Sequence, residues 1–326
     1  MRKYNILVTG VGAIIGYGVI SSLRKSKYQC NIIGMDIYSD AVGQVWCDHF
    51  LQAIPAADEN YINFLNETID KYHIDLVFFG TEQEIQRCYE CRVELQKNYS
   101  KLVLNRDNII PIAGDKWKTH CFLTEHGIKS IPSSIYYDFD EAKEEFGLPL
   151  LLKPRRSYAS KGICLAYTKE EFDAWRTKYS DQFMVQKMVG DDEHEYTAAT
   201  FGLRNGRCIH PIVMRRKLSK AGATDKAIVY PVPEIDSQIY RLCESLKPIG
   251  PINFQFRLHD GDFLLLEINP RISASTSIRT AFGYNEAEMC IGFFLEGVLP
   301  PEPIIRTGRA YRYITEAVEY ESSGDI

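Results

Sequence analysis

The chain has 326 residues, 45% of them hydrophobic, which is too long for one ordinary core and predicts two or three packed units. Its formal net charge is -5, so no basic excess is available to hold a nucleic-acid backbone. No apolar run approaches membrane-spanning length. We therefore expect neither nucleic-acid binding nor a membrane location.

The N-terminus and the cysteines indicate a cytoplasmic protein. The first residues lead directly into a strand-like segment and lack a long apolar region, so no signal peptide is expected. Nine dispersed cysteines are typical of reduced thiols. The close pair Cys88 and Cys91 is expected on a helix that begins near Glu82, and a zinc site is the less favoured alternative.

Residues 1–112 alternate short apolar runs with helical stretches. The pattern is βαβ and predicts an open parallel sheet in a Rossmann-like N-terminal domain. The expected strands are 6–9, 31–35, 76–79 and 102–104, and the expected helices lie near 16–26, 60–72 and 83–97.

A glycine-rich turn follows the first strand and opens a helix, with Gly10, Gly12 and Gly16 in a GxGxxxG spacing. Such a turn can bring backbone N–H groups close to a phosphate, and Asp36 stands where a ribose-binding acid would be found. The spacing is a weak signal, because many such domains use glycine here only for tight packing. An NAD(P)-linked oxidoreductase is therefore one alternative function.

Residues 113–187 are expected to form a linking helix and a small α+β unit. Asp115 is a plausible N-cap for a helix over 115–126, with Lys116 in its first turn and Lys118 as an equally exposed competitor for an anion. The unit itself is expected to contain strands at 150–153, 163–167 and 183–187 and helices near 140–146 and 169–178.

Lys153 ends an otherwise apolar strand and precedes a proline, which keeps it extended. The loop 155–162 that follows is small, cationic and hydroxylic, and so is suited to cover a triphosphate. The alternatives are a lysine whose charged end reaches solvent and a solvated loop.

Longer strands at 195–203, 208–216, 252–258 and 262–268 are expected after residue 188, with a hairpin turn at 259–262 and helices near 235–246 and 285–297. Backbone groups of the segment 183–189 could pair with an adenine edge, and Glu195 could hold ribose hydroxyls. The acidic cluster 191–195 also fits a solvated turn. The basic run 215–217 precedes a glycine-containing loop and fits either an anion site or a solvated face.

The segment 263–271 is the most informative in the chain. Side chains alternate along a strand, so Glu267 and Asn269 share one face. Two oxygen ligands at a strand end suit Mg²⁺ carried by a nucleoside triphosphate, and Arg271 is placed to grip phosphate oxygens. Taken alone, an edge strand with ordinary polar residues fits equally well.

Taken in order, these motifs resemble those of the ATP-grasp superfamily, and most of all its carbamoyl-phosphate-synthase-like branch. The resemblance covers nearly the whole chain. It runs from the glycine-rich turn through Asp115-Lys116, Leu-Leu-Lys153-Pro, Val-Gln-Lys187-Met-Val and Asn-Phe-Gln255-Phe to Leu-Glu267-Ile-Asn269-Pro-Arg271. The lid loop has fewer glycines than is usual in the family, and the first metal position is a neutral Gln255, which leaves tight two-metal binding open.

The resemblance implies a role for each matching residue. ATP would be bound by Lys116, Lys153, Ser157, Ser160, Gly162, Gln186, Lys187, Val189 and Glu195. One or two Mg²⁺ ions, with Mn²⁺ as an alternative, would be held by Gln255, Glu267 and Asn269. The catalytic residues would be Arg271, Arg216 and Lys217, which would face the transferred phosphoryl group, the triphosphate or the substrate carboxylate.

The expected fold is therefore α/β and α+β. It has an N-terminal open parallel domain (1–112), a linking helix with a lid subdomain (113–187) and an antiparallel core with the metal site (188–326). The expected activity is an ATP-dependent carboxylate–amine ligase that works through an acyl phosphate; a non-catalytic ATP-binding module is a further alternative. Small-molecule carboxylate and amine substrates are implied. They would be read by the first domain, the loop 217–230 and the segment after Arg271, where polar residues of 273–279 could bind a small carboxylate. The apolar stretch 289–299 is expected to pack on the core, and a homodimer is left open.

Overall fold

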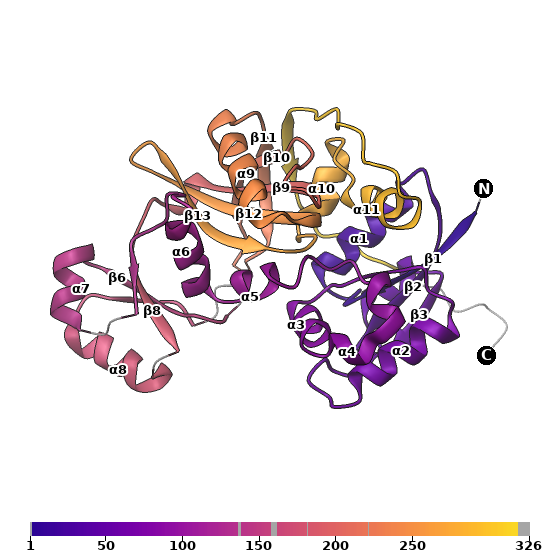
Figure 1. Ribbon diagram of the computed structural model, residues 1–326, viewed down its shortest axis with the longest axis horizontal. Coiled ribbons are helices and arrows are strands. Elements are labelled where there is room, and N and C mark those ends of the chain that lie inside the picture. Colours follow the sequence, from indigo (N-terminus) through magenta and orange to yellow (C-terminus); the bar gives the residue numbers. More distant parts are fainter. Residues whose placement is uncertain (1, 136–137, 158–161, 181, 221, 319–326) are drawn as a thin grey trace.

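The computed structural model describes residues 2–135, 138–157, 162–180, 182–220 and 222–318, so Ser160 lies outside the described residues. Three separate sheets organise the chain: a parallel one, a small antiparallel one and a six-stranded antiparallel one (Figure 1). The six-stranded sheet lies between the other two along the long axis of the molecule. The expected α/β and α+β architecture is confirmed.

The parallel sheet has the order β3-β2-β1-β4, with helices on both faces. Ile6, Leu7 and Val8 of β1 are fully buried, as expected for a sheet covered on both sides. Three of the four predicted strands are confirmed, whereas 102–104 forms only a parallel bridge to β4. The elements are β1 (Lys3–Thr9), α1 (Ile14–Arg24), β2 (Gln29–Asp36), β3 (His49–Gln52), α2 (Tyr61–Lys71), β4 (Leu76–Phe78), α3 (Glu82–Glu90) and α4 (Arg92–Leu95).

Two short helices lead to the small antiparallel sheet, whose order is β5-β8-β6-β7. Both α7 and α8 pack on one face of it, around Phe139, Phe172 and Phe183. Because strand side chains alternate, the opposite face carries Lys153 and Gln186 together with the apolar Leu151 and Met184. The elements are α5 (Ile109–Ala113), α6 (Lys116–Glu125), β5 (Ser133–Ser134), α7 (Phe139–Phe146), β6 (Leu150–Pro154), β7 (Cys164–Ala166), α8 (Lys169–Tyr179) and β8 (Phe183–Lys187).

The six-stranded sheet has the order β13-β12-β9-β10-β11-β14. The predicted hairpin is confirmed, with Asp260 and Gly261 at φ of 50° and 84°, values that suit a tight two-residue turn. β10 begins at Ile212 rather than at residue 208, because Pro211 has no N–H to donate to a ladder. The strands are β9 (Glu195–Leu203), β10 (Ile212–Leu218), β11 (Thr224–Val229), β12 (Ile249–His259), β13 (Asp262–Asn269) and β14 (Gly308–Tyr311).

Helices cover both faces of this sheet. α9 (Pro233–Leu246) and α6 pack on one face, where alternate residues such as Phe254 and Phe256 are fully buried. α1, α10 (Thr276–Ala281) and α11 (Glu286–Cys290) pack against apolar residues of the opposite face. A π-helical turn, Ile291–Leu295, continues α11, and its buried side chains join the core as expected, whereas Val298 and Leu299 at the end of the predicted stretch 289–299 are exposed.

All nine cysteines are free, and Cys88 lies on α3 as predicted. Among the described residues, no helix is both long and apolar enough to cross a membrane.

Candidate active site

The register of β12 and β13 brings the predicted metal ligands together. Gln255 pairs directly with Glu267, and Asn253 pairs with Asn269. Residues opposite each other in an antiparallel pair point to the same face, as do residues two apart in one strand. Gln255, Glu267 and Asn269 therefore share a face, turned away from the α9 core.

Glu267 has an environment that fits a cation site. Within the described part of the chain, neither the Gln255 side chain nor the Glu267 side chain has a hydrogen-bond or ion-pair partner. Burial and the neighbouring Glu82 raise the pKa of the Glu267 carboxyl, while Lys116, Arg271 and Lys153 act in the opposite direction. An unpaired carboxylate next to an amide suits Mg²⁺. One carboxylate and two amides would balance only part of the charge of the ion, and nucleotide phosphates could balance the rest.

Arg271 lies beyond the end of β13, and its neighbours fix it. It donates to Asn269 Oδ1 at 3.1 Å and to the carbonyl of Ile272 at 3.1 Å, and it forms an ion pair with Glu82. Asn269 is thus shared between Arg271 and the predicted metal site. Glu82 was not predicted, although its position as the first residue of a helix that follows a parallel strand was a usable signal.

Lys153 is buried and does not reach solvent. Its side chain on β6 is 6% exposed, and Nζ donates to Gln186 Oε1 at 2.7 Å. Gln186 in turn donates to Ser133 Oγ at 2.7 Å. Burial lowers the pKa of Lys153 to about 7, with Lys116 acting in the same direction and Glu267 against it. These couplings place the amines of Lys153 and Lys116 in the same charged neighbourhood as Glu267.

Lys116 connects the linking helix to the loop after β6. Its Nζ donates to the Ser157 carbonyl at 2.7 Å and to Ser157 Oγ at 3.1 Å. Burial lowers the pKa of Lys116, whereas Glu267 and Glu82 raise it. Gly162, at the far end of the loop, adopts a φ of 79° that favours glycine. Lys116 and Ser157 therefore lie together, and their contacts with ATP stay a prediction.

Asp115 holds this arrangement in place. It caps α6 as predicted, accepting from the N–H of Trp117 at 3.0 Å, and it forms a bidentate ion pair with Arg155 at 3.2 and 2.7 Å. The backbone N–H of Lys116 also donates to the Arg155 carbonyl at 2.9 Å. The start of α6 and the end of β6 are thus tied together at one buried carboxylate.

Replacing Asp115 with alanine (D115A) is expected to lower the free energy of unfolding by about 3–5 kcal/mol, because it removes a helix cap and the bidentate ion pair with Arg155. D115N keeps a capping oxygen and serves as the matched control, with a smaller loss expected. Urea unfolding monitored by circular dichroism measures both. Equal stability of D115A and wild type would contradict the role of Asp115.

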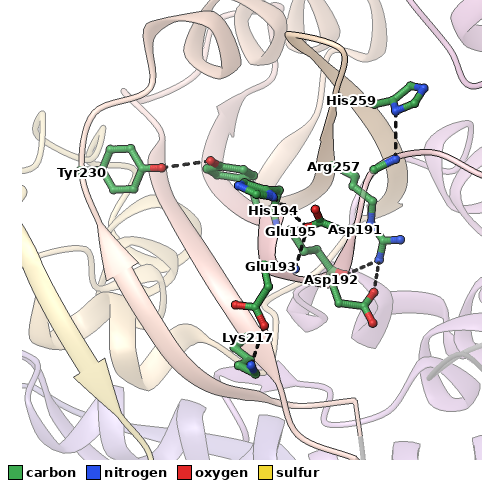
Figure 2. A network of polar contacts seen from close by, with 11 residues as sticks. Asp191, Asp192, Glu193, His194, Glu195, Lys217, Tyr230, Arg257 and His259 are labelled. Atoms are coloured by element: carbon green, nitrogen blue, oxygen red, sulfur yellow. Dashed lines mark hydrogen bonds and ion pairs between the residues drawn. The ribbon is translucent and has the colours of Figure 1, made fainter.

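Glu195 lies between two arginines. Oε1 accepts from Arg216 at 3.1 and 2.7 Å, and Oε2 accepts from Arg257 at 3.1 Å; the carboxylate is 6% exposed. Figure 2 shows Arg257 reaching both this residue and Asp192 in the acidic turn. Arg257 was missed by sequence reasoning, although it follows Gln255 by two residues on the same face. A ribose would therefore contact a Glu195 carboxylate whose charge the two arginines compensate.

Lys217 is placed apart from this face. It follows Arg216 by one residue, so its side chain points to the opposite side of β10. It is 56% exposed and pairs with Glu193 at 2.5 Å (Figure 2). The structure thus brings Arg216 close to the site through Glu195 but gives Lys217 no contact there, and its catalytic role stays a prediction.

Lys187 and Val189 lie at the end of β8 and directly beyond it. The backbone N–H of Lys187 donates to the carbonyl of Pro132 at 3.0 Å, so this donor is already used in the ligand-free protein. Val189 is buried in a small cluster with Ile131 and Leu264. The segment passes between the small sheet and the core, as the adenine role requires, and that role stays a prediction.

Arg279, expected near the carboxylate substrate, is fully buried instead. It donates to Ser273 Oγ at 2.9 Å and to Thr197 Oγ1 at 3.0 Å, and it pairs with Glu286 at 3.4 Å. It also donates to Asn253 on β12. Its observed contacts therefore support the segment behind Arg271.

The glycine-rich first turn is closed by its own acid. The N–H of Gly12 donates to Asp36 Oδ2 at 2.8 Å, and Asp36 Oδ1 accepts from the N–H of Tyr38 at 3.1 Å. A side chain at Gly16 would lie 2.4 Å from the Gly10 carbonyl oxygen. The glycines therefore serve close packing, and the groups that would hold a dinucleotide bind each other, which disfavours the oxidoreductase alternative.

A cavity of about 630 Å³ opens beside the metal-ligand face. One wall is α3 of the parallel domain, another is α5, and the third is the end of β13. Arg156 and Ser157 of the loop after β6 border it. Its volume is within the range of small-molecule sites.

Part of the chain matches a known protein family. Residues 180–317 match the family described as ATP-grasp in the biosynthetic pathway with Ter operon. The carbamoyl phosphate synthase large chain of Methanosarcina acetivorans is 28% identical over 49% of this chain and 17% of its own length. The C-terminal section of that of Aquifex aeolicus is 24% identical over 63% of this chain and 42% of its own length. The chain thus spans less than half of either relative.

Two solved structures share the fold. N5-carboxyaminoimidazole synthetase from Staphylococcus aureus, complexed with ADP, has a TM-score of 0.72 and 18% identity and covers 92% of this chain and 80% of its own. The biotin carboxylase domain of Hydrogenobacter thermophilus 2-oxoglutarate carboxylase, with MgADP, has a TM-score of 0.72 and 17% identity. Its match covers 94% of this chain and 73% of its own chain. Residues 180–317 thus match an ATP-grasp family, and the chain is similar to carbamoyl phosphate synthase large chains and has the fold of the two solved structures.

Proposed function

We propose that the protein is an ATP-dependent carboxylate–amine ligase that forms an amide or peptide-like bond through an acyl phosphate. The observation that carries the proposal is the unpaired Glu267 carboxylate on the core sheet, opposed by the buried amine of Lys153 and the half-buried amine of Lys116. Anionic triphosphate and a divalent cation would together balance these charges.

The chemistry would proceed in two steps. A carboxylate oxygen of the first substrate attacks the γ-phosphorus of ATP, the bond to the β-phosphate oxygen breaks, and ADP leaves. The nitrogen of the amine substrate then attacks the carbonyl carbon, phosphate leaves, and the nitrogen loses a proton to solvent. Such transfer needs positioning and charge neutralisation more than a side-chain nucleophile.

The residues would divide the work by position. Lys153 and Lys116 would contact phosphate oxygens, and Arg271 would stabilise the transferred phosphoryl group. Gln255, Glu267 and Asn269 would hold one or two Mg²⁺ ions, with Mn²⁺ as an alternative, whose charge would screen the phosphates. Lys187 and Val189 would border adenine, with Glu195 and Arg257 near the ribose.

The remaining parts of the proposal concern organisation and setting. Residues 113–187 would act as linking helix and lid, closing on the core at 188–326 and excluding water from the acyl phosphate. Free thiols throughout the chain support a cytoplasmic setting. A homodimer is supported by the related biotin carboxylase domain, which was crystallised as a dimer.

A hydroxamate screen tests the proposal. The protein is incubated with Mg-ATP, hydroxylamine and pooled small carboxylates, because hydroxylamine traps an acyl phosphate whatever the natural amine is. We expect one hydroxamate with stoichiometric ADP. ATP binding without any hydroxamate from a broad panel would favour a non-catalytic ATP-binding module, and a lack of ATP binding would overturn the nucleotide assignment.

A further inference from the structure

The cavity next to Arg271 has charged walls from two parts of the fold. Glu82, Gln86 and Arg87 line it from α3, and Glu267, Asn269 and Arg271 line it from the end of β13 and the residues beyond. A ligand there would lie against the proposed phosphate site on one side and against the parallel domain on the other. The cavity is thus placed to present a substrate group to the transferred phosphoryl.

One ion pair crosses this cavity. Arg271 Nη2 contacts Glu82 Oε1, and the two side chains are 13% and 32% exposed. Arg271 is also anchored by Asn269 and the Ile272 carbonyl, whereas Glu82 has no other hydrogen-bond or ion-pair partner in the described part of the chain. Glu82 can therefore exchange its partner without releasing Arg271.

We propose that this pair binds the charged groups of an α-amino acid, which is the carboxylate substrate. Arg271 would take the carboxylate and Glu82 the ammonium. The inference rests on the proposed ligase function and names the substrate class of its site.

Charge and geometry both favour such a ligand. A purely anionic substrate would displace Glu82 from Arg271 and leave that carboxylate near Glu267, whose pKa it already raises. A zwitterion replaces one ion pair with two. Because Arg271 and Glu82 touch, the two ligand charges must also lie close together, as on the α-carbon of an amino acid and not at the ends of a longer ω-amino acid.

The wild-type protein provides the first test. Hydroxamate formation is compared for α-amino acids, for the matched acids without the amino group, and for ω-amino acids of equal length. We expect product from one or a few α-amino acids and at least about 30-fold less from the other two panels, the loss expected when a charged group of the site is left without its partner. Product from the desamino acids at equal efficiency would overturn the inference and leave the ligase proposal standing. Failure of every panel would overturn both.

The isosteric variant E82Q provides the second test. We expect the KM for the amino acid to rise at least about 30-fold, and the preference over the desamino acid to fall, while binding of a non-hydrolysable ATP analogue is unchanged. E94Q, an exposed change on α4 outside the cavity, is the matched control. An unchanged KM and preference in a folded E82Q, with folding checked by its melting temperature, would contradict the role of Glu82.

Discussion

Replacing Glu267 with glutamine (E267Q) is expected to reduce ATP-dependent hydroxamate formation by about a hundred- to a thousand-fold. The shape of the site is kept, but the metal-ligand set becomes three neutral amides, which provide no charge to hold Mg²⁺. The rate is measured with the substrate that the screen identifies. Turnover within tenfold of wild type would contradict the metal assignment.

The same variant should keep or improve the stability of the ligand-free protein. The folded pKa of Glu267 lies above its ordinary 4.5, so between these values the folded state binds more protons than the unfolded state. Wild-type stability from this group is therefore full below pH 4.5 and is lost as the pH rises through the folded pKa. E267Q lacks this loss. Its free energy of unfolding, relative to that of wild type, should therefore rise as the pH increases from 4.5 through the folded pKa of Glu267.

D262N is the matched control for both measurements. Asp262 lies at the other end of β13, is half exposed, and pairs with Lys129 at the surface. Exposed pairs contribute about 0–1 kcal/mol, so D262N should change neither turnover nor the pH profile appreciably. A loss of activity in D262N equal to that in E267Q would indicate that β13 is sensitive to substitution in general.

Much of the fold follows from local patterns in the chain. The two-residue period of β13 correctly predicted that Glu267 and Asn269 share a face, and Asp115 was recognised as a helix cap from its position. Four strands were not predicted: β3, β5, β11 and β14. Of these, β11 lies inside the six-stranded sheet, and the charged Asp225 and Lys226 interrupt its apolar pattern, whereas the other three are edge strands. Short edge strands have weak patterns because only one neighbour stabilises them.

The charge pairing of the site depends on register between distant segments and so could not be predicted. Glu195 faces Arg216 and Arg257 because both pair with it across neighbouring strands. The contact between Glu82 and Arg271 joins residues 189 positions apart and requires the parallel domain to pack against the end of β13. Sequence identified several participants, but the pairings that decide which charges remain free arise only in the folded chain.

Replacing Lys153 with methionine (K153M) is expected to weaken binding of a non-hydrolysable ATP analogue by about 30- to 150-fold, the effect of losing one charged hydrogen bond to a phosphate. Methionine has a similar length and apolar stem, so β6 should keep its packing. Titration calorimetry measures the affinity. K169M, which removes an exposed lysine from α8, is the control and should bind as wild type does.

The pH dependence separates this electrostatic role from a packing role. The pKa of Lys153 is about 7 in the folded, ligand-free protein, against an ordinary 10.5, so at pH 8 most molecules would have to take up a proton to present a cation to phosphate. Wild-type binding at pH 8 should therefore absorb up to about one proton, seen as a dependence of the binding enthalpy on the buffer's ionisation enthalpy, and K153M should absorb less. Equal proton uptake by the two proteins would show that Lys153 does not titrate on binding.

The lowered pKa of Lys153 also affects the stability of the protein without nucleotide, and there the charged lysine is unfavourable. Between pH 7 and 10.5 the unfolded chain binds more protons at Lys153 than the folded chain does, so wild-type stability should rise with pH across that window, by at most about 1.4 kcal/mol per pH unit. K153M lacks this slope. The free energy of unfolding of wild type should therefore rise relative to that of K153M as the pH increases from 7 to 10.5. A lysine that weakens the free fold near neutral pH and strengthens nucleotide binding is placed for its ligand rather than for the stability of β6, and parallel pH profiles for the two proteins would contradict that conclusion.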